Sequence, residues 1–239
     1  MLTHIPVPLS AADSVRCSVA DRSRLTPVDP KLSRAAAHRL SQYLRSLGTG
    51  ARAVGTVSSV ELSAAVGVSA AQVRRDLAAL GHLGQRGIGY DAVGLRTAIK
   101  RKLGIDRRWR AVLVGVGNLA RALLRHRGFT EQGFDIVGLF DTDETKIGRV
   151  VDGLPVEPMT ALRDGVGRLN AELGVLTVPS EPAQTVADLL VQGGVKGILN
   201  FAPVVLKLPT GVKQVTVDLA IQFEQLAFAV ADPGERAES

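Results

Sequence analysis

The segment that most constrains the fold is an apolar strand followed at once by closely spaced glycines. Arg110–Val114 predicts a short buried strand, and the turn Gly115-Val116-Gly117-Asn118-Leu119-Ala120 leads into a helix expected over Leu119–His126. A G-x-G-x-x-A spacing between a strand and a helix is typical of dinucleotide-binding domains. The first glycine permits the tight turn, and the second lets the backbone approach a pyrophosphate at the helix N-terminus. Ala120 still allows close packing of the helix on the strand, so a Rossmann domain is expected.

A second predicted strand ends in the acidic residue that such a domain uses. Phe134–Phe140 forms this strand and Asp141 follows it, a little beyond the usual spacing of about 20 residues from the glycines. A carboxylate here accepts hydrogen bonds from both ribose hydroxyls and repels a 2′-phosphate, so the pattern favours NAD(H) over NADP(H). Lys146 lies nearby and either covers the adenosine or is solvated; we expect it to be solvated.

Alternating helices and strands continue to residue 200. The expected elements are a helix over Thr160–Glu172, a strand over Leu173–Val178, a helix over Pro182–Gln192 and a strand over Val195–Asn200. Ligands of open parallel sheets bind outside the carboxyl ends of the strands. The residues expected to line the nicotinamide half of the site are therefore Thr177, Val178, Pro179, Asn200, Phe201, Ala202 and Pro203. The alternative is that the two prolines only stop strands and that the phenylalanine is plain core.

The charge is divided unevenly along the chain. Residues 1–110 carry 18 Lys and Arg against 7 Asp and Glu, whereas residues 111–239 carry 11 against 16. A basic first half suits a polyanion, because neutralising phosphates releases condensed counterions. A merely solvated basic surface explains the same numbers, so charge alone does not decide between the two.

Two short helices separated by a tight turn are expected within this basic half. Ser58 and Glu61 form a capping box for a helix over Ser58–Val66, which Gly67 can end in the left-handed conformation. Ser69 and Gln72 form a second box for a helix over Ser69–Leu80. This arrangement predicts a helix-turn-helix.

The second of these helices has an apolar face and a polar face. Val73, Leu77 and Leu80 are expected in the core, while Gln72 and Arg75 share an outward face. Arg and Gln can make bidentate hydrogen bonds to guanine and adenine edges, respectively, so the polar face suits DNA. The alternative is an ordinary helical hairpin with a solvated polar face.

Four glycines between Gly81 and Tyr90 predict a tight β-hairpin next to this helix. Such a hairpin is the wing of a winged helix, and Arg86 in it is available to a phosphate or to the minor groove. A helix over Asp91–Leu103 is expected to follow and to stop at Gly104, and a basic run surrounds the linker beyond it.

The two ends of the chain have different character. Residues 1–31 contain four prolines and no hydrophobic period, which predicts a flexible tail before a helix over Ser33–Leu47. Asp218–Val230 predicts an apolar final helix that packs on its own domain or on a dimer partner. The single cysteine, Cys17, excludes an intramolecular disulfide, and we expect neither a secretory signal nor a membrane span. A cytoplasmic protein is expected.

These segments, in this order, resemble the redox-sensing transcriptional repressor family Rex from about Leu40 to Val230. The segments that carry the resemblance are Thr56-Val57-Ser58-Ser59, Gln72-Val73-Arg74-Arg75-Asp76-Leu77, Arg86-Gly87-Ile88-Gly89-Tyr90-Asp91, Gly115-Val116-Gly117-Asn118-Leu119, Leu199-Asn200-Phe201-Ala202-Pro203 and Val217-Asp218-Leu219-Ala220. The resemblance implies a homodimeric repressor that binds an inverted-repeat operator when NADH is low and releases it when NADH rises. It also implies that the C-terminal helix swaps into the partner, beneath the partner's winged domain.

The resemblance also implies roles for individual residues. Tyr90 resembles the tyrosine that links the winged domain to the cofactor site, and Asp218 resembles its acidic counterpart near the swapped helix. The DNA-binding residues that follow from the motifs are Ser58, Ser59, Ser69, Gln72, Arg74, Arg75 and Arg86. The expected α/β architecture is a tail over 1–31, a winged helix-turn-helix domain over 32–106, a Rossmann NAD(H)-binding domain over 107–217, and a dimerisation helix and tail over 218–239.

Departures from the family pattern leave the operator sequence open. They are Ala78 and Ala79, which follow Asp76-Leu77 of the recognition helix, and His82 and Gln85 in the wing. A paralogue with altered operator preference is therefore one alternative, and a cofactor-blind architectural DNA binder is another.

An NAD-dependent dehydrogenase with an accessory N-terminal domain is a further alternative. It needs an acid or base near the nicotinamide, but the four histidines (His4, His38, His82 and His126) lie before the Rossmann segment or on its first helix. An Asp or Lys acid could still serve.

Overall fold

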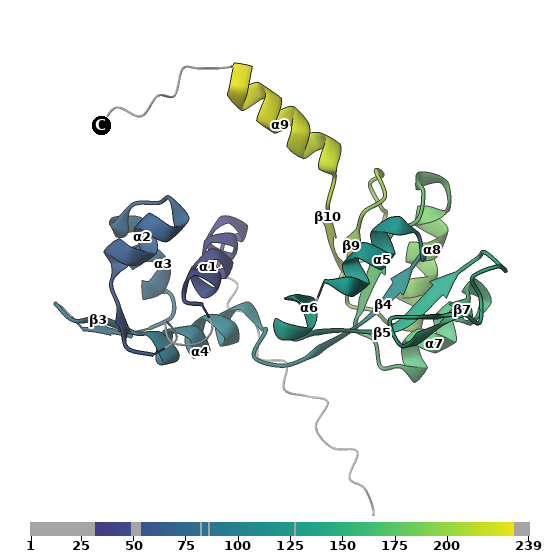
Figure 1. Cartoon of the computed structure of the whole chain (residues 1–239), viewed down its shortest axis with the longest axis horizontal. Coiled ribbons are helices and arrows are strands. Elements are labelled where there is room, and N and C mark those ends of the chain that lie inside the picture. Colours follow the sequence, from purple (N-terminus) through teal and green to yellow (C-terminus); the bar gives the residue numbers. More distant parts are fainter. Residues whose placement is uncertain (1–31, 49–53, 82, 86, 127, 232–239) are drawn as a thin grey trace, which may run out of the picture.

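The computed structural model describes residues 32–48, 54–81, 83–85, 87–126 and 128–231. The expected tail over residues 1–31, together with His82 and Arg86, lies outside the described residues. Figure 1 shows a small helical domain on one side, a larger domain built on a parallel sheet on the other, and a C-terminal helix apart from both.

The smaller domain is a winged helix. Its elements are α1 (Arg34–Ser46), β1 (Thr56–Val57), α2 (Ser59–Val66), α3 (Ala70–Ala78), β2 (Gly84–Gln85), β3 (Gly89–Asp91) and α4 (Ala92–Leu103). The three short strands form an antiparallel sheet in the order β1-β3-β2. Helices α1, α3 and α4 meet around a core that includes Leu40, Tyr43, Leu77 and Ile99, all of them 1% exposed or less.

The caps of α2 and α3 explain where these helices begin. Ser58 and Glu61 form the reciprocal capping box expected for α2, and Gly67 ends that helix with a φ of 74°. Ser69 accepts a hydrogen bond from the backbone N–H of Gln72, so it caps α3. The expected second capping box is wrong, because the Gln72 side chain bonds to Asp76 and Arg75 instead of returning to Ser69.

The larger domain is a seven-stranded sheet in the order β10-β9-β8-β4-β5-β7-β6. Its elements are β4 (Trp109–Val114), α5 (Asn118–Arg125), α6 (Gly128–Glu131), β5 (Phe134–Asp141), β6 (Val150–Val151), β7 (Leu154–Pro158), η2 (Met159–Ala161), α7 (Leu162–Arg168), β8 (Leu173–Leu176), α8 (Ser180–Gly193), β9 (Gly197–Asn200) and β10 (Lys213–Thr216). All neighbouring strands pair in parallel except β6, which is antiparallel to β7.

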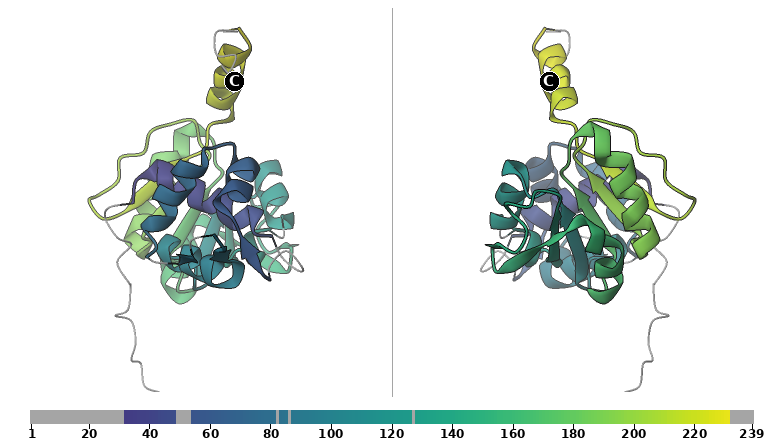
Figure 2. Two further views of the ribbon diagram at one scale, coloured as in Figure 1. Left: turned by 90° about the vertical axis from the view of Figure 1, so that its left-hand side faces the viewer. Right: turned by 90° about the vertical axis from the view of Figure 1, so that its right-hand side faces the viewer.

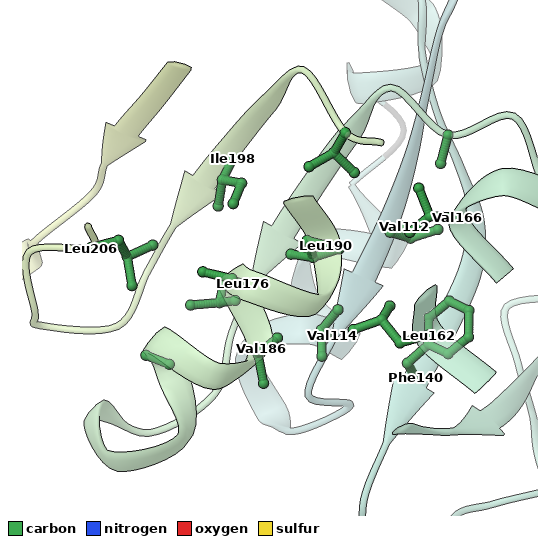
Figure 3. Packing of buried hydrophobic residues seen from close by; sticks show 14 of the residues in the cluster. Val112, Val114, Phe140, Leu162, Val166, Leu176, Val186, Leu190, Ile198 and Leu206 are labelled. Atoms are coloured by element: carbon green, nitrogen blue, oxygen red, sulfur yellow. The ribbon is translucent and has the colours of Figure 1, made fainter. Parts of the chain in front are cut away.

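Strand β4 is buried on both faces, as expected for the centre of a parallel sheet. Val112 and Val114 point into a core shared with α7 and α8, which Figure 3 shows together with Phe140 and Leu190. The alternate residues of β4 point into a second core on the face that carries α5. Because both faces of β4 are buried, the position of its C-terminal end is set by the packing of the sheet. The position of the glycine turn that follows is set with it.

The predicted boundaries differ from the structure where short-range signals compete. The helix expected over Thr160–Glu172 is shortened to α7, because Met159–Ala161 forms a 3₁₀ turn and Asn170 adopts a φ of 48°. The hairpin of β6 and β7 and the edge strand β10 were not expected. Strands of two to five residues carry too little periodicity to be recognised in a sequence.

The final helix, α9 (Leu219–Ala231), is exposed along its whole length. It has no buried residue, and Phe223 and Phe228 are 72% and 69% exposed. Figures 1 and 2 show it standing clear of both domains in three views. A helix with this composition needs a covering surface, and the described residues of one chain do not provide it.

No helix within the described ranges is both long and apolar enough to cross a membrane.

Candidate functional site

The turn after β4 has the geometry that a dinucleotide requires. Gly115 has a φ of 91°, and a Cβ at this position would lie 2.8 Å from the carbonyl oxygen of Thr177. Gly117 has extended backbone, and a Cβ there would meet no atom within 4 Å. Gly115 is therefore fixed by the fold itself, whereas Gly117 leaves open space at the N-terminus of α5. A pyrophosphate fits this kind of opening.

Asp141 is buried at the end of β5, beside this turn. Its Oδ2 accepts hydrogen bonds from the backbone N–H of Val116 at 2.7 Å and from Lys146 Nζ at 3.0 Å. Its Oδ1 accepts from the backbone N–H of Asp143 at 2.9 Å. Burial alone would raise the pKa of Asp141, but these hydrogen bonds outweigh it and the pKa is lowered. Asp141 is therefore an anion held against the dinucleotide turn.

Lys146 is not merely solvated, so the sequence expectation for it is wrong. Its ammonium group bonds to Asp141, lies 3.4 Å from the carboxylate of Asp143, and has a pKa raised first by the hydrogen bond to Asp141. The pairing depends on how residues 142–146 turn, which no local pattern predicts. The end of β5 therefore presents a paired carboxylate and ammonium beside the glycine turn.

The ends of β8 and β9 meet at the same edge of the sheet. Thr177 donates its hydroxyl hydrogen bond to the carbonyl oxygens of Val114 and Gly115, at 2.9 and 2.8 Å. A Cβ on Gly115 would also lie 2.8 Å from Val178, and Pro179 precedes α8. The structure therefore brings Thr177 and Val178 against the glycine turn, and Pro179 follows them as the N-cap residue of α8.

The predicted residues after β9 shape a loop. Asn200 is fully buried; its amide donates to the carbonyl of Val204 at 2.9 Å and its Oδ1 accepts from the N–H of Ala202 at 2.9 Å. Ala202 is buried, Phe201 is partly buried in the core beneath α5, and Pro203 is exposed. Asn200 thus holds the loop in place, and the exposed members of the loop remain available to a ligand.

The predicted recognition helix presents its basic residues to solvent. In α3, Val73, Asp76 and Leu77 are buried, whereas Arg74 and Arg75 are exposed. Arg74 donates to the Ser59 hydroxyl at 3.2 Å, which ties α3 to the start of α2. A cavity of about 490 Å³ lies between these helices and the wing; Ser58, Gln85 and Tyr90 are among its lining residues.

A buried carboxylate on α3 is the main feature that the sequence prediction missed. Asp76 is 5% exposed and accepts two hydrogen bonds from Arg39, at 2.6 and 2.7 Å, and one from the Tyr43 hydroxyl at 2.9 Å. Gln72 supplies a fourth at 2.8 Å. The available signal was the position of Asp76, three residues after the core residue Val73.

The pKa values of this cluster follow from burial and charge. Burial alone would raise the pKa of Asp76, but the hydrogen bonds from Arg39, Gln72 and Tyr43 outweigh it and the pKa is lowered. Burial, followed by the bond to Asp76, raises the pKa of Tyr43 to about 12. The cluster is therefore an ion pair with a neutral tyrosine at neutral pH, and it joins α1 to α3.

Two arginines of the basic run around the linker pair with acidic residues of the Rossmann domain. Arg107 donates to Glu172 at 2.7 and 3.1 Å and lies 3.7 Å above the Trp109 ring, while Arg108 pairs with Asp135. These arginines are therefore neutralised by acidic residues of the sheet domain, unlike the two exposed arginines of α3.

Tyr90 and Asp218, which the family resemblance implies as the link between the winged domain and the cofactor site, lie on different parts of the chain. Tyr90 is in the wing strand β3, beside Gly84, where an added Cβ would come within 2.7 Å of the Tyr90 ring. Asp218 caps α9 by accepting from the N–H of Ala220 at 2.9 Å. No described hydrogen bond or ion pair joins the two residues within one chain.

Neither described histidine supports dehydrogenase chemistry. His38 lies on α1, and His126 follows the C-terminal end of α5 and packs edge-on against Phe129. The strand ends that would hold a nicotinamide are at the opposite end of α5. No three His, Cys, Asp or Glu side chains gather as metal ligands in the part of the chain that the structure describes.

Curated proteins similar to this chain decide its family. It is 47% identical over 191 residues to the redox-sensing transcriptional repressor Rex of Syntrophomonas wolfei, covering 80% of this chain and 90% of the relative. It is 46% identical over 201 residues to Rex of Carboxydothermus hydrogenoformans, covering 84% and 97%. The chain belongs to the Rex family of redox-sensing transcriptional repressors. These relatives are named as repressors, which favours a regulator over a dehydrogenase.

Family models and solved structures agree with the Rex assignment. A model for the N-terminus of putative DNA-binding proteins matches residues 31–78, and a CoA-binding domain model matches residues 106–204. The crystal structure of RSP in complex with beta-NAD+ and operator DNA has a TM-score of 0.77 and 32% identity, covering 86% of this chain and 98% of that one. The crystal structure of RSP in complex with beta-NADH has a TM-score of 0.74 and 31% identity, covering 84% of this chain and 94% of that one.

The Asp76 cluster predicts an acid-sensitive contribution to stability. Because the pKa of Asp76 is lower in the folded chain, its contribution is complete above the unfolded value near 4 and is lost as the pH falls through the folded value. We expect Asp76→Asn to lower the free energy of unfolding by about 2 kcal/mol at pH 7. The difference from the unmodified chain should shrink below about pH 4.

Denaturant titration at several pH values measures this effect. Asp91→Asn is the matched control, because Asp91 caps α4 on the same domain and Asn caps a helix equally well. An Asp76→Asn variant as stable as the Asp91→Asn control at pH 7 would contradict the assignment.

Proposed function

We propose that this chain is a transcriptional repressor that binds an inverted-repeat operator as a homodimer and releases it when NADH binds, so that it senses the ratio of NADH to NAD+. The observation that carries the proposal is the presence, in one Rex-family chain, of a winged helix with exposed arginines and a dinucleotide turn beside a buried aspartate. The corresponding units are 32–106 for DNA, 107–217 for NAD(H) and 218–239 for dimerisation.

The winged helix supplies the proposed DNA contacts. Helix α3 is placed to enter the major groove, with Arg74 and Arg75 exposed and Gln72 on the same side. Ser58, Ser59 and Ser69 lie at the N-termini of α2 and α3, where backbone N–H groups favour phosphates. Arg86 completes the proposed set from the wing. Because a repressor acts on chromosomal DNA, we place it in the cytoplasm.

The carboxyl ends of the parallel strands supply the proposed NAD(H) site. Residues Gly115 to Ala120 are placed to bind the pyrophosphate, and Asp141 the adenosine ribose. Thr177, Val178 and Pro179, with the loop from Asn200 to Pro203, are placed around the nicotinamide, whose bound form reports the redox state. Tyr90 is the proposed contribution of the winged domain. A 2′-phosphate would meet the Asp141 carboxylate, which supports NAD(H) over NADP(H).

Two uncovered surfaces support the homodimer. Helix α9 exposes apolar side chains along its length, and an apolar cavity of about 400 Å³ lies beside Leu113, Val175 and Leu199 on the α5 side of the sheet. Gln214 borders this cavity and has a buried Oε1 without a hydrogen-bond partner among the described residues. A second copy whose α9 is exchanged would cover apolar surface on both chains.

A gel-shift titration on inverted-repeat DNA at fixed salt tests the function. We expect NADH to release the DNA at concentrations where NAD+ has little effect. Gly117→Val should fold normally, because its side chain enters open space, yet weaken NADH binding by roughly tenfold or more because it blocks the pyrophosphate. DNA binding that responds to neither dinucleotide would contradict redox sensing.

The dimer proposal predicts that α9 carries the assembly. Phe223→Glu should convert a dimer to a monomer in light scattering, because it places a charge on an apolar contact. Gln222→Glu, which adds the same charge to the neighbouring exposed position, is the control and should leave the mass unchanged. A Phe223→Glu protein that retains the mass of two chains would place the interface elsewhere.

The switch proposal predicts that Tyr90 and Asp218 couple the two domains across the dimer. Tyr90→Phe keeps the ring beside Gly84, and Asp218→Asn can keep the cap on α9, so both variants should still bind DNA. We expect each to need at least roughly tenfold more NADH for release in the same titration. Normal release of DNA by NADH from both variants would show that Tyr90 and Asp218 do not couple the two domains.

A further inference from the structure

The amide of Gln72 lies between a buried acid and an exposed arginine of the same helix. Its Nε2 donates to Asp76 Oδ1 at 2.8 Å, and its Oε1 accepts from Arg75 Nη2 at 2.6 Å. The amide therefore has a defined orientation, with nitrogen toward the core and oxygen toward Arg75.

Asp76, the buried residue in this set of hydrogen bonds, is held by several partners. A carboxylate offers about four acceptor sites, and those of Asp76 receive Gln72, Tyr43 and two N–H groups of Arg39. Removing the Gln72 donor would leave a buried, charged acceptor short of one partner, which is unfavourable. The structure thus opposes rotation of the Gln72 amide away from Asp76.

Direct reading of adenine by Gln72 would compete with the two hydrogen bonds that orient its amide. A glutamine that reads adenine uses its nitrogen to donate to N7 and its oxygen to accept from N6, both on the same outward edge. The Gln72 amide keeps a second N–H and a second lone pair, but its bonds to Asp76 and Arg75 hold it along the helix rather than toward a base. Arg75 is in the opposite situation, since one of its five N–H donors is used by Gln72 and two others suffice for the O6 and N7 atoms of guanine.

We infer that Gln72 and Asp76 are positioning residues that present Arg75 to one base pair of the operator, and that Gln72 does not read a base itself. The inference rests on the proposed function as a DNA-binding repressor. It assigns Arg39 and Tyr43 of α1 to the support of base selection by α3. Arg74 is not part of the hydrogen bonds that join Asp76, Gln72 and Arg75, because its guanidinium donates to Ser59 instead.

The test compares base preferences in two single variants and their double variant. A pool of randomised DNA duplexes is bound by the full-length chain, by Gln72→Ala, by Arg75→Ala and by the double variant, and the bound fractions are sequenced. Gln184→Ala is the matched control, because Gln184 makes the same i,i+4 bond to Asp188 on α8 of the Rossmann domain. Thermal unfolding of each variant checks the fold.

We expect Gln72→Ala and Arg75→Ala to lose discrimination at the same base pair of each half-site, by on the order of tenfold for Arg75→Ala. The double variant should be no worse than Arg75→Ala alone, because the two residues act as one unit. Gln184→Ala should keep the preferences of the unmodified chain.

Two results would overturn the inference in different ways. Loss of discrimination by Gln72→Ala at a base pair that Arg75→Ala leaves intact, with additive effects in the double variant, would make Gln72 a base reader. An unmodified chain that enriches no sequence from the pool would overturn the proposed DNA-binding function, and this inference with it.

Discussion

The rest of the Rossmann domain depends on one turn that tolerates no side chain at its first residue. The N–H of Gly115 donates to Phe140 at the end of β5, and its carbonyl accepts from Thr177 after β8, at 2.8 Å in both cases. The next N–H, of Val116, donates to Asp141. The contacts that align three strands therefore also hold open the N-terminus of α5, so the binding site follows from the registration of the sheet.

Local and long-range interactions set the limit of what the sequence could predict. The capping box of Ser58, the glycine turn and the strand ending in Asp141 depend on neighbouring residues, and each was predicted and is confirmed as structure. Arg39, the charged partner of Asp76, lies 37 residues away on α1, and periodicity carries no information about such a pair. Lys146 was misjudged for a related reason, since its contact depends on the course of a loop.

Net charge along the sequence was a poor guide to which basic residues face DNA. Arg107 and Arg108 contribute to the basic first half, yet both are paired with acidic residues of the Rossmann domain. The exposed arginines of α3 carry the electrostatic argument instead, because a phosphate or base edge can displace water from them without breaking an ion pair. The distribution of partners, which only the structure supplies, decides this point.

The linker between the domains limits how a redox signal can reach α3. The indole N–H of Trp109 donates to the carbonyl of Gly104 at 2.8 Å, and Arg107 is held between the Trp109 ring and Glu172. Moving an operator-binding population from 99% to 1% requires NADH to favour the released state by about 10⁴-fold. These contacts fasten the linker to the sheet domain, so under the proposed function the exposed helix α9 offers that coupling a second route, through another copy of the chain.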